Sequence, residues 1–507
     1  MAVLNYVCFV FICTIVGAKV LKHDLFPLHI VHYNDFHARF EETSLKFPVC
    51  GANDTSCLGG FARLVQEINT LLNQYPDALL LNAGDTFQGT YWYTLFKWNV
   101  TLEFINMLPN DAHAIGNHEF DDSIPGLVPY LKGLRAPVVA ANLDITNEPT
   151  LGGLFQPHVV VERHGRKIGI IGLITTDTLT TSNPRDTIFL DPIPIVQKEA
   201  QLLTDQGVDI IIVLSHCGLI VDIEIAKTVG ENIDVIVGGH THSLLWNGTS
   251  PSHEKISGPY PVMVETDHGN GHKVVIVTAS AFTKYLGNIT VYFDDNGDLQ
   301  SFDATPIFLN RSIPEDPVMK SLLKPYNDEI HHLVEEVIGY SNDVLPDKDC
   351  GSKECAIANL VADAVLSEAR LINPTNLTSV SLIVRNNIRG LLPKGEITRG
   401  MIINILPFTN PIVSFELRGR YLLDALNLCL VPSWNEVPFT GPLMPHVSDL
   451  RVTLNHTQPR HVISIEVKEG DHYVPLDMDK VYQITTLDFL RKGGDGFEVC
   501  MIQIAGT

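Results

Sequence analysis

The chain has 507 residues, 45% of them hydrophobic and 18% charged, and its formal net charge at pH 7 is −23. This length is enough for two or more domains with separate cores. The negative charge argues against binding to nucleic acids or to anionic membranes, which would repel it.

The N-terminal segment has the features of a signal peptide. Residues 1–18 are almost entirely apolar, carry no charge and end in Val16-Gly17-Ala18. Small residues before a cleavage site are typical of secretory signals, and the run is short for a membrane anchor. No later segment is apolar enough to span a bilayer. We therefore predict cleavage after Ala18 and secretion to the extracellular space.

Five short apolar runs are each followed by polar residues that can bind metals. The runs cover residues 28–33, 78–83, 112–115, 209–214 and 234–237. Such runs predict buried strands, and helical stretches near residues 60–72 and 195–205 indicate an α/β fold. In open α/β sheets, sites form at the carboxyl ends of strands. We expect one rim to carry Asp35, His37, Asp85, Asn117, His216, His240 and His242.

This set of side chains predicts a centre for two divalent cations. It contains no cysteine, which argues against a structural thiolate zinc site. Imidazole with carboxylate suits zinc, manganese, iron or cobalt. We take zinc as the first choice, with manganese, cobalt, or activation by calcium or magnesium as alternatives. Two cations about 4 Å apart clamp the attacking and leaving oxygens of an in-line displacement.

Asp85, which offers two oxygens, is the expected bridge between the two cations. The other ligands divide into two sets of three: Asp35, His37 and His242, and Asn117, His216 and His240.

The cysteines and sequons agree with secretion. Cys50 with Cys57, and Cys350 with Cys355, are close pairs that predict local disulfides in an oxidising compartment. Cys217 follows a proposed ligand, but we expect a small buried hydrophobe there. The pairing of Cys429 and Cys500 is left open. Seven sequons predict glycosylation: Asn53, Asn99, Asn247, Asn288, Asn310, Asn376 and Asn455.

The chain divides near residue 312. A type I′ turn signal at residues 294–297 predicts a hairpin before this point. Apolar spacing over residues 314–337 then predicts an amphipathic helix that joins two domains, although Pro325 should kink or break it. From residue 340 we expect a smaller α/β domain. Its strands lie near 380–384, 413–417 and 482–486, and its helices near 356–369 and 420–428.

The ordered motifs resemble a known family. Asn34-Asp35-Phe36-His37, Gly84-Asp85, Gly116-Asn117-His118-Glu119 and Gly239-His240-Thr241-His242 are similar to the calcineurin-like metallophosphoesterases. Gly493-Gly494-Asp495-Gly496-Phe497 narrows the resemblance to the 5'-nucleotidase and apyrase family.

This resemblance implies a domain organisation. The expected parts are a signal peptide (1–18), a metallophosphoesterase domain (19–312) built as a four-layer α/β/β/α sandwich, a linker helix (313–339) and a nucleotide-binding domain (340–507).

The resemblance also implies roles for individual residues. The seven rim residues match the family's metal positions. His118, oriented by Asp121, matches the catalytic pair and would stabilise charge on the phosphoryl group or leaving oxygen. In the C-terminal domain Phe408 and Phe489 match the base-stacking aromatics, Asp495 the ribose-binding acid and Arg389 the substrate arginine.

Two positions depart from the family pattern. The family usually has Asn-Gly-Gly-Gly-Ile-Arg where this chain has residues 384–389, so Val384 replaces an Asn that would contact the base or sugar. The family also often has Arg after the first Cys of the second close pair, where Gly351 stands here. One phosphate-binding arginine is therefore lost unless Arg385 substitutes for it.

Two hypotheses follow. The first is a secreted hydrolase of ATP and ADP, or of AMP, that acts by attack of a metal-bound hydroxide. The second is a weakly active or inactive protein that binds nucleotides or a host platelet receptor. The complete metal set favours the enzyme.

Only ten residues follow Phe497, so we expect no lipid anchor. Short, anchorless members resemble salivary apyrases of blood-feeding arthropods, which remove platelet-activating ADP.

Overall fold

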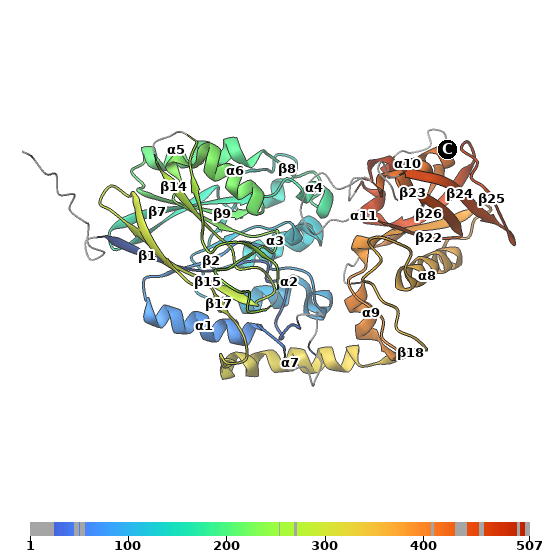
Figure 1. The fold of residues 1–507 in the computed structure, drawn as a ribbon, viewed down its shortest axis with the longest axis horizontal. Coiled ribbons are helices and arrows are strands. Elements are labelled where there is room, and N and C mark those ends of the chain that lie inside the picture. The colour runs from blue at the N-terminus through green and yellow to red at the C-terminus, as the bar shows by residue number, and fades with distance from the viewer. Residues whose placement is uncertain are drawn as a thin grey trace, which may run out of the picture.

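The structure is a computed structural model that describes residues 25–44, 50, 56–252, 254–267, 271–406, 410–430, 444–455, 461–493 and 497–501. The chain forms a larger N-terminal body and a smaller C-terminal body, with helix α7 (Pro317–Val334) running along one side (Figure 1). The predicted signal peptide, Phe408, Asp495 and Asn53 lie outside the described residues.

The first N-terminal sheet has the order β16-β15-β1-β2-β3-β4, with β17 paired to β15. Strands β1 to β4 run parallel, and β15 joins β1 antiparallel. Its strands are β1 (Phe26–Tyr33), β2 (Leu79–Asn82), β3 (Ala112–Ala114), β4 (Val138–Val139), β15 (Tyr285–Phe293), β16 (Leu299–Ala304) and β17 (Ile307–Phe308).

The second sheet has the order β13-β14-β10-β9-β7-β6. Its four inner strands are parallel and the two edge strands antiparallel. The strands are β6 (His158–Arg163), β7 (Arg166–Ile174), β9 (Ile210–His216), β10 (Val235–Gly238), β13 (Val262–Glu265) and β14 (Lys273–Val277). Two short pairs complete this body: β5 (Leu143–Asp144) with β8 (Ile188–Phe189), and β11 (Leu244–Leu245) with β12 (Ile256–Gly258).

Helices cover the outer face of each sheet. The first sheet packs on α1 (Phe61–Gln74), α2 (Tyr91–Ile105) and α3 (Ser123–Gly133), and the second on α5 (Pro192–Asp205) and α6 (Leu219–Val229). A short helix, α4 (Thr178–Thr181), and three 3-10 helices, at His118–Phe120, Pro149–Leu151 and Gly230–Asn232, lie in the connections.

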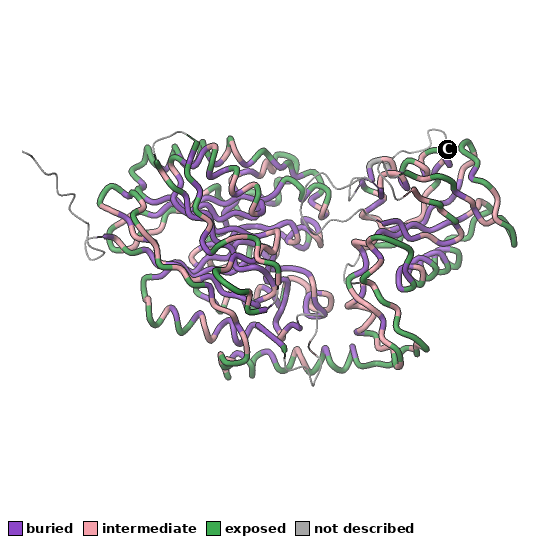
Figure 2. Tube along the Cα trace, in the orientation of Figure 1, coloured by how far each residue is buried: buried purple, intermediate pink, exposed green. Residues whose placement is uncertain are grey.

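The alternation of side chains along the strands explains the layers. On β1, Leu28 and Ile30 face the core between the sheets, whereas Val31 and Tyr33 face α1 to α3. Period-two alternation lets one strand bury both faces. The result is a four-layer α/β/β/α sandwich whose purple interior is visible in Figure 2.

The C-terminal body is a smaller α/β unit. A four-stranded sheet has the order β21-β26-β19-β22, beside a β23-β24-β25 sheet and a β18-β20 pair. The strands are β18 (Val337–Ser341), β19 (Ser379–Val384), β20 (Gly395–Thr398), β21 (Ile412–Arg418), β22 (Pro445–Ser448), β23 (Leu450–Asn455), β24 (His461–Glu469), β25 (His472–Pro475) and β26 (Val481–Leu487). The helices are α8 (Ala356–Ile372), α9 (Arg399–Ile405), α10 (Gly419–Leu428) and α11 (Asp488–Arg491), with 3-10 helices at Arg385–Asn387 and Glu498–Met501.

The structure corrects one local expectation and excludes one alternative of a second. The β15–β16 hairpin forms, but Gly297 has a φ of 89° while Asp295 and Asn296 do not have positive φ, so its turn is not type I′. Helix α7 continues through Pro325, so the proline does not break it, which was one of the two outcomes expected from the sequence.

Candidate dimetal active site

The two sheets bring the seven rim residues together from strand ends that belong to different layers. Asp35 and His37 follow β1, Asp85 follows β2 and Asn117 follows β3, all in the first sheet. In the second sheet, His216 ends β9, and His240 and His242 follow β10. The rim is therefore shared by two sheets that face each other.

One set of three side chains gathers its donor atoms at one point. Nε2 of His37 and Nε2 of His242 lie 3.0 Å apart, and Nε2 of His242 lies 3.2 Å from Oδ1 of Asp35. Two donors bound to one zinc ion at about 2.1 Å each are separated by roughly 3.0 to 3.4 Å, depending on the angle between them. Nδ1 of His37 is 3.1 Å from the carbonyl oxygen of Phe87, an acceptor that keeps the ring proton on Nδ1. Nε2 is then unprotonated and faces the other donors of the set. These side chains fit a cation.

The second set is built in the same way. Oδ1 of Asn117 lies 3.3 Å from Nε2 of His216 and 3.0 Å from Nδ1 of His240. His216 turns its Nδ1 to the carbonyl oxygen of Ala83 at 2.7 Å. Oδ2 of Asp85 lies 3.1 Å from Nε2 of His216 and 3.6 Å from Nε2 of His37 in the first set. Asp85 therefore occupies the position that a bridging ligand needs.

The backbone of the rim is strained. Left-handed φ angles are uncommon for residues with a side chain and concentrate at functional sites. Five of the seven rim residues have them: Asp35 (50°), His37 (49°), Asp85 (54°), His240 (76°) and His242 (50°). Asp35 donates its N–H to the carbonyl oxygen of Gly84, and His37 donates to that of Asp85, both at 3.0 Å. These bonds hold the loop after β1 against the loop after β2.

Burial and charge control the protonation of the rim. Burial lowers the pKa of His37 to about 3 and that of His240 to about 4, so both imidazoles are neutral. Burial also acts to lower the pKa of His216, but Asp85 outweighs it and raises this pKa to about 10. Since a cation binds neutral imidazole, its binding at His216 would release a proton.

His118 and Asp121 lie beside the rim as a hydrogen-bonded pair. Nδ1 of His118 is 2.7 Å from Oδ2 of Asp121, and the backbone N–H of His118 donates to Oδ1 of Asp85 at 2.9 Å. Burial acts to lower the pKa of His118, but Asp121 and Asp85 outweigh it and raise the pKa to about 9. An imidazolium in this place can stabilise negative charge on a reacting phosphate.

Three neighbours of the site were not found from the sequence. Ser182 donates to Oδ1 of Asp121 at 2.7 Å, and Gln88 donates to its Oδ2 at 3.3 Å. The ring of Phe282 lies 5.4 Å from that of His37 and 5.0 Å from that of His242. No sequence pattern marks Ser182 or Phe282, because each is brought to the site from a distant part of the chain.

The C-terminal body approaches this site through Arg389. Arg389 is exposed, and its positive charge acts on His118 to lower the histidine pKa, which indicates that it lies near His118 and Asp121. Its backbone N–H donates to the carbonyl oxygen of Ile405 at 2.8 Å. Phe489, on α11, is partly buried against the C-terminal core. Part of its side chain is thus in contact with that core.

The first residue of the loop at residues 384–389 is not available to contact a ligand. Val384 is fully buried in the C-terminal core, so its side chain does not face a ligand. Arg385 lies near the position that lacks an arginine, because a Cβ atom added to Gly351 would be 3.9 Å from its Cγ. Nη2 of Arg385 is 3.6 Å from Oδ2 of Asp347.

The predicted close cysteine pairs are disulfide-bonded. The Cα atoms are 6.0 Å apart in Cys50–Cys57 and 5.1 Å apart in Cys350–Cys355. Cys217, Cys429 and Cys500 are buried thiols.

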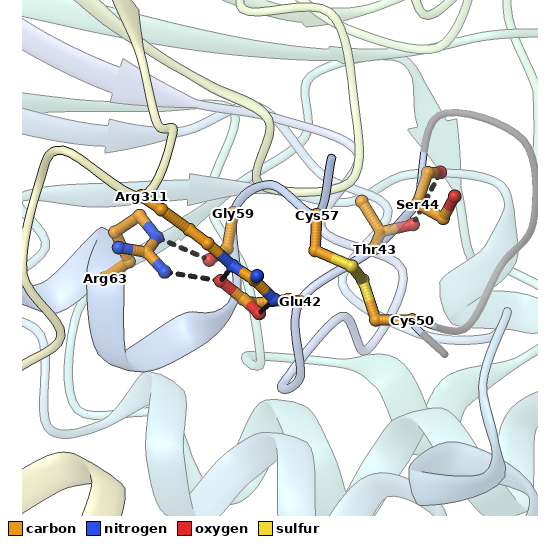
Figure 3. Close-up of a disulfide and its surroundings, with 8 residues drawn as sticks. All are labelled: Glu42, Thr43, Ser44, Cys50, Cys57, Gly59, Arg63 and Arg311. Carbon is orange, nitrogen blue, oxygen red and sulfur yellow. Dashed lines mark hydrogen bonds and ion pairs between the residues drawn. A yellow bond between two sulfur atoms is a disulfide. The ribbon is translucent and has the colours of Figure 1, made fainter. Parts of the chain in front are cut away.

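A charged cluster near the first disulfide ties the loop after β1 to α1 (Figure 3). Arg63 on α1 donates to Oε1 of Glu42 at 2.5 Å, and Arg311 donates to Oε2 at 2.6 Å.

The sequons differ in accessibility. Asn99, Asn247 and Asn376 are exposed, and Asn310 and Asn455 are partly exposed. Asn288 lies within β15, opposite Val31, and its Oδ1 is buried. A glycan there would have to emerge from the middle of a sheet, so its position argues against modification. Among the described residues, no helix is both long and apolar enough to cross a membrane.

Known proteins share this architecture. Residues 28–244 match the family described as calcineurin-like phosphoesterase, and residues 337–501 match the 5'-nucleotidase C-terminal domain. An apyrase of Tabanus yao is 41% identical, over 93% of this chain and 86% of the relative. An apyrase of Anopheles gambiae is 36% identical, over 93% and 84%. The crystal structure of a 5'-nucleotidase precursor from Thermus thermophilus superposes with a TM-score of 0.81 at 35% identity, covering 94% of this chain and 92% of that one.

Proposed function

Because this chain belongs to the 5'-nucleotidase and apyrase family and is a phosphoric ester hydrolase, we propose that it is a secreted, metal-dependent apyrase. Its proposed substrates are ATP and ADP, with AMP as the alternative. The observation that carries the proposal is the meeting of two sets of metal-compatible donors at Asp85, beside His118 and Asp121. The similarity to proteins named apyrase supports the choice of substrate.

The proposed site holds two divalent cations, with zinc as the first choice because its donors are nitrogen and oxygen atoms. Such a pair polarises a phosphoryl oxygen and lowers the pKa of a bound water. Asp35, His37 and His242 would hold one cation, Asn117, His216 and His240 the other, and Asp85 both.

The remaining roles fall to side chains around the cations. His118 would donate a hydrogen bond to charge that develops on the phosphoryl or leaving oxygen, and Asp121 would hold its ring in place. Arg389 would bind the phosphate tail from the C-terminal side, with Arg385 in place of the arginine absent at position 351. Phe489 would stack on the base, together with Phe408.

The proposed domains are a catalytic part at 19–312, a linker at 313–339 and a nucleotide-binding part at 340–507. We propose that the protein is secreted after removal of residues 1–18, since it has two disulfides and three exposed sequons. Removal of extracellular ADP would limit platelet aggregation in a host, a role we propose from the relatives named apyrase.

A second candidate is a binding protein with little turnover. It is favoured by Gly351 and by the loop at residues 384–389, whose sequence departs from the family pattern. In this loop Oδ1 of Asn387 accepts a hydrogen bond from the backbone N–H of Val384 at 3.4 Å, which closes the loop on itself. The complete donor sets favour the enzyme, because a protein that had lost turnover would not need them.

The test is phosphate release from ATP, ADP and AMP by the purified secreted protein, with divalent metals and then with a chelator. We expect release from ATP and ADP that the chelator abolishes. Release from AMP would make the protein a 5'-nucleotidase. Bound metal without release from any of the three would favour the binding protein.

A further inference from the structure

Glu119 is a buried carboxylate that the proposed chemistry does not use. It directly follows His118 in a 3-10 helix, its exposed fraction is 2%, and it is not one of the seven rim residues. It lies behind the rim, between the loop after β2, which carries Asp85, and the loop after β3, which carries Asn117.

Three successive backbone N–H groups of the Asp85 loop point at this carboxylate. Asp85 donates to Oε2 at 3.0 Å, and Thr86 and Phe87 donate to Oε1 at 2.6 Å and 3.2 Å. The left-handed φ angles of Gly84 (90°) and Asp85 (54°) turn the chain here. Successive N–H groups in such a turn form a concave site for an anion. Glu119 supplies that anion from within the chain.

The same carboxylate also holds the second loop. Gly116 donates its N–H to Oε2 of Glu119 at 2.6 Å. The two loops touch so closely that a Cβ atom on Gly116 would lie 2.2 Å from Oδ1 of Asp85. A fifth donor, the hydroxyl of Thr86, reaches Oε1 at 2.6 Å and is itself 2.9 Å from the hydroxyl of Tyr130. Glu119 thus accepts hydrogen bonds from the loop that carries Asp85 and from the loop that carries Asn117, two of the loops that present metal-compatible side chains.

We propose that Glu119 is a positioning residue that fixes Asp85 and Asn117 in the geometry needed to retain the metal pair. The inference rests on the metal-dependent function proposed above. Without this carboxylate, four buried N–H groups would lose their acceptor, and an unsatisfied buried donor costs about 1–3 kcal/mol. The strained Asp85 loop would then relax, and the bridge would leave the point where both donor sets meet.

The test is zinc binding by the full-length Glu119→Gln variant. Glutamine keeps the size, but it offers one acceptor oxygen and places an NH₂ group against the backbone donors. We expect its zinc affinity, measured by competition with a chromogenic chelator, to fall about 10- to 100-fold, as for other partners of metal ligands. Phosphate release should recover as zinc is raised to saturation, with the half-saturating zinc concentration shifted by the same factor.

A matched control separates this role from a general loss of a buried acid. Glu199 is a buried carboxylate on α5, 2.8 Å from Nδ1 of His158 and on the far face of the second sheet. Glu199→Gln should leave zinc affinity unchanged. The melting temperature of the metal-free proteins is the second readout. A merely structural Glu119 would lower that temperature while zinc affinity stayed at the wild-type value, which would overturn the proposal.

A gentler variant keeps the test decisive if Glu119→Gln does not fold. Thr86→Val is nearly isosteric and removes one of the five donors, so it should weaken zinc binding by about 2- to 10-fold, the range of one net hydrogen bond. Unchanged affinity in Thr86→Val would then overturn the proposal. If the wild-type protein binds none of zinc, manganese and cobalt, the proposed function fails. If the wild type and Glu119→Gln bind zinc equally, only the role of Glu119 fails.

Discussion

At the residue scale, Asp85 is the side chain on which both proposed metal positions depend. Its Oδ2 lies within 3.1 Å of His216 and 3.6 Å of His37, one from each set. Asp85→Asn keeps the size but removes the charge that would bridge the two proposed cations. We expect phosphate release to fall by about 10²- to 10³-fold or more. Steady-state kinetics at saturating metal check this, with Asp303→Asn on β16 as the control. Near-normal turnover would remove Asp85 from the bridging role.

His32 makes a separate prediction about stability. It is fully buried on β1, its Nε2 is 2.9 Å from the hydroxyl of Tyr260, and burial lowers its pKa to about 3. In the unfolded chain the His32 imidazole has an ordinary pKa near 6.5. As pH falls, the unfolded chain therefore binds a proton at His32 before the folded protein does. Its contribution to stability is therefore complete above about pH 6.5 and is lost as pH falls from there toward 3.

The measurement is urea unfolding of chelator-treated protein between pH 7 and pH 4. We expect His32→Gln to lose less stability over this interval than the wild type does. His332→Gln, at an exposed position on α7, is the control and should follow the wild type. Identical pH slopes for all three proteins would contradict the assignment to His32.

At the element scale, the close approach of the two sheets depends on Gly172 in β7. A Cβ atom there would lie 2.1 Å from the carbonyl oxygen of Val139 in β4, and Ala141 donates to the carbonyl oxygen of Gly172 at 2.7 Å. Gly172→Ala must push the sheets apart, and we expect a loss of about 1–3 kcal/mol of unfolding free energy. Urea unfolding at pH 7 checks this. Gly339→Ala on β18, where the nearest atom is 3.9 Å away, should be almost neutral.

Helix α7 shows how packing can outweigh a local signal. Pro325 removes a backbone donor and should interrupt a helix. The next residue, Tyr326, packs its ring 5.9 Å from Trp92, 5.2 Å from Phe96 and 5.6 Å from Phe104. These contacts with α2 hold the helix on the N-terminal body through the proline. Apolar spacing therefore located the helix, but its continuity depended on a partner distant in sequence.

At the scale of the whole molecule, the proposed reaction needs both bodies. Arg389 belongs to the C-terminal body, yet its charge acts on His118 in the other. We expect Arg389→Ala to lower kcat/KM for ADP by about 10- to 100-fold, the loss of one hydrogen bond to a charged group. Arg451→Ala, exposed on β23, is the control. Equal effects of the two substitutions on ADP hydrolysis would remove Arg389 from substrate binding.

The sequence alone was sufficient for features that depend on neighbours along the chain. Apolar period and composition located β1, β2, β3, β9 and β10 and the polar residues at their ends, since a buried strand and the turn after it are local patterns. Close spacing was enough for both local disulfides. The order of the motifs was specific enough to indicate the family, which the comparisons then confirmed.

Only the tertiary structure decided what depends on segments distant in sequence. It divided the rim between two sheets, set Phe282 and Ser182 beside the site, and buried Val384 in the C-terminal core. It also revealed that Glu119 accepts hydrogen bonds from two loops. A one-dimensional pattern identifies which side chains can bind a metal, because that depends on their chemistry. The sequence pattern does not identify the atoms that orient these side chains, because those contacts form only when the layers pack.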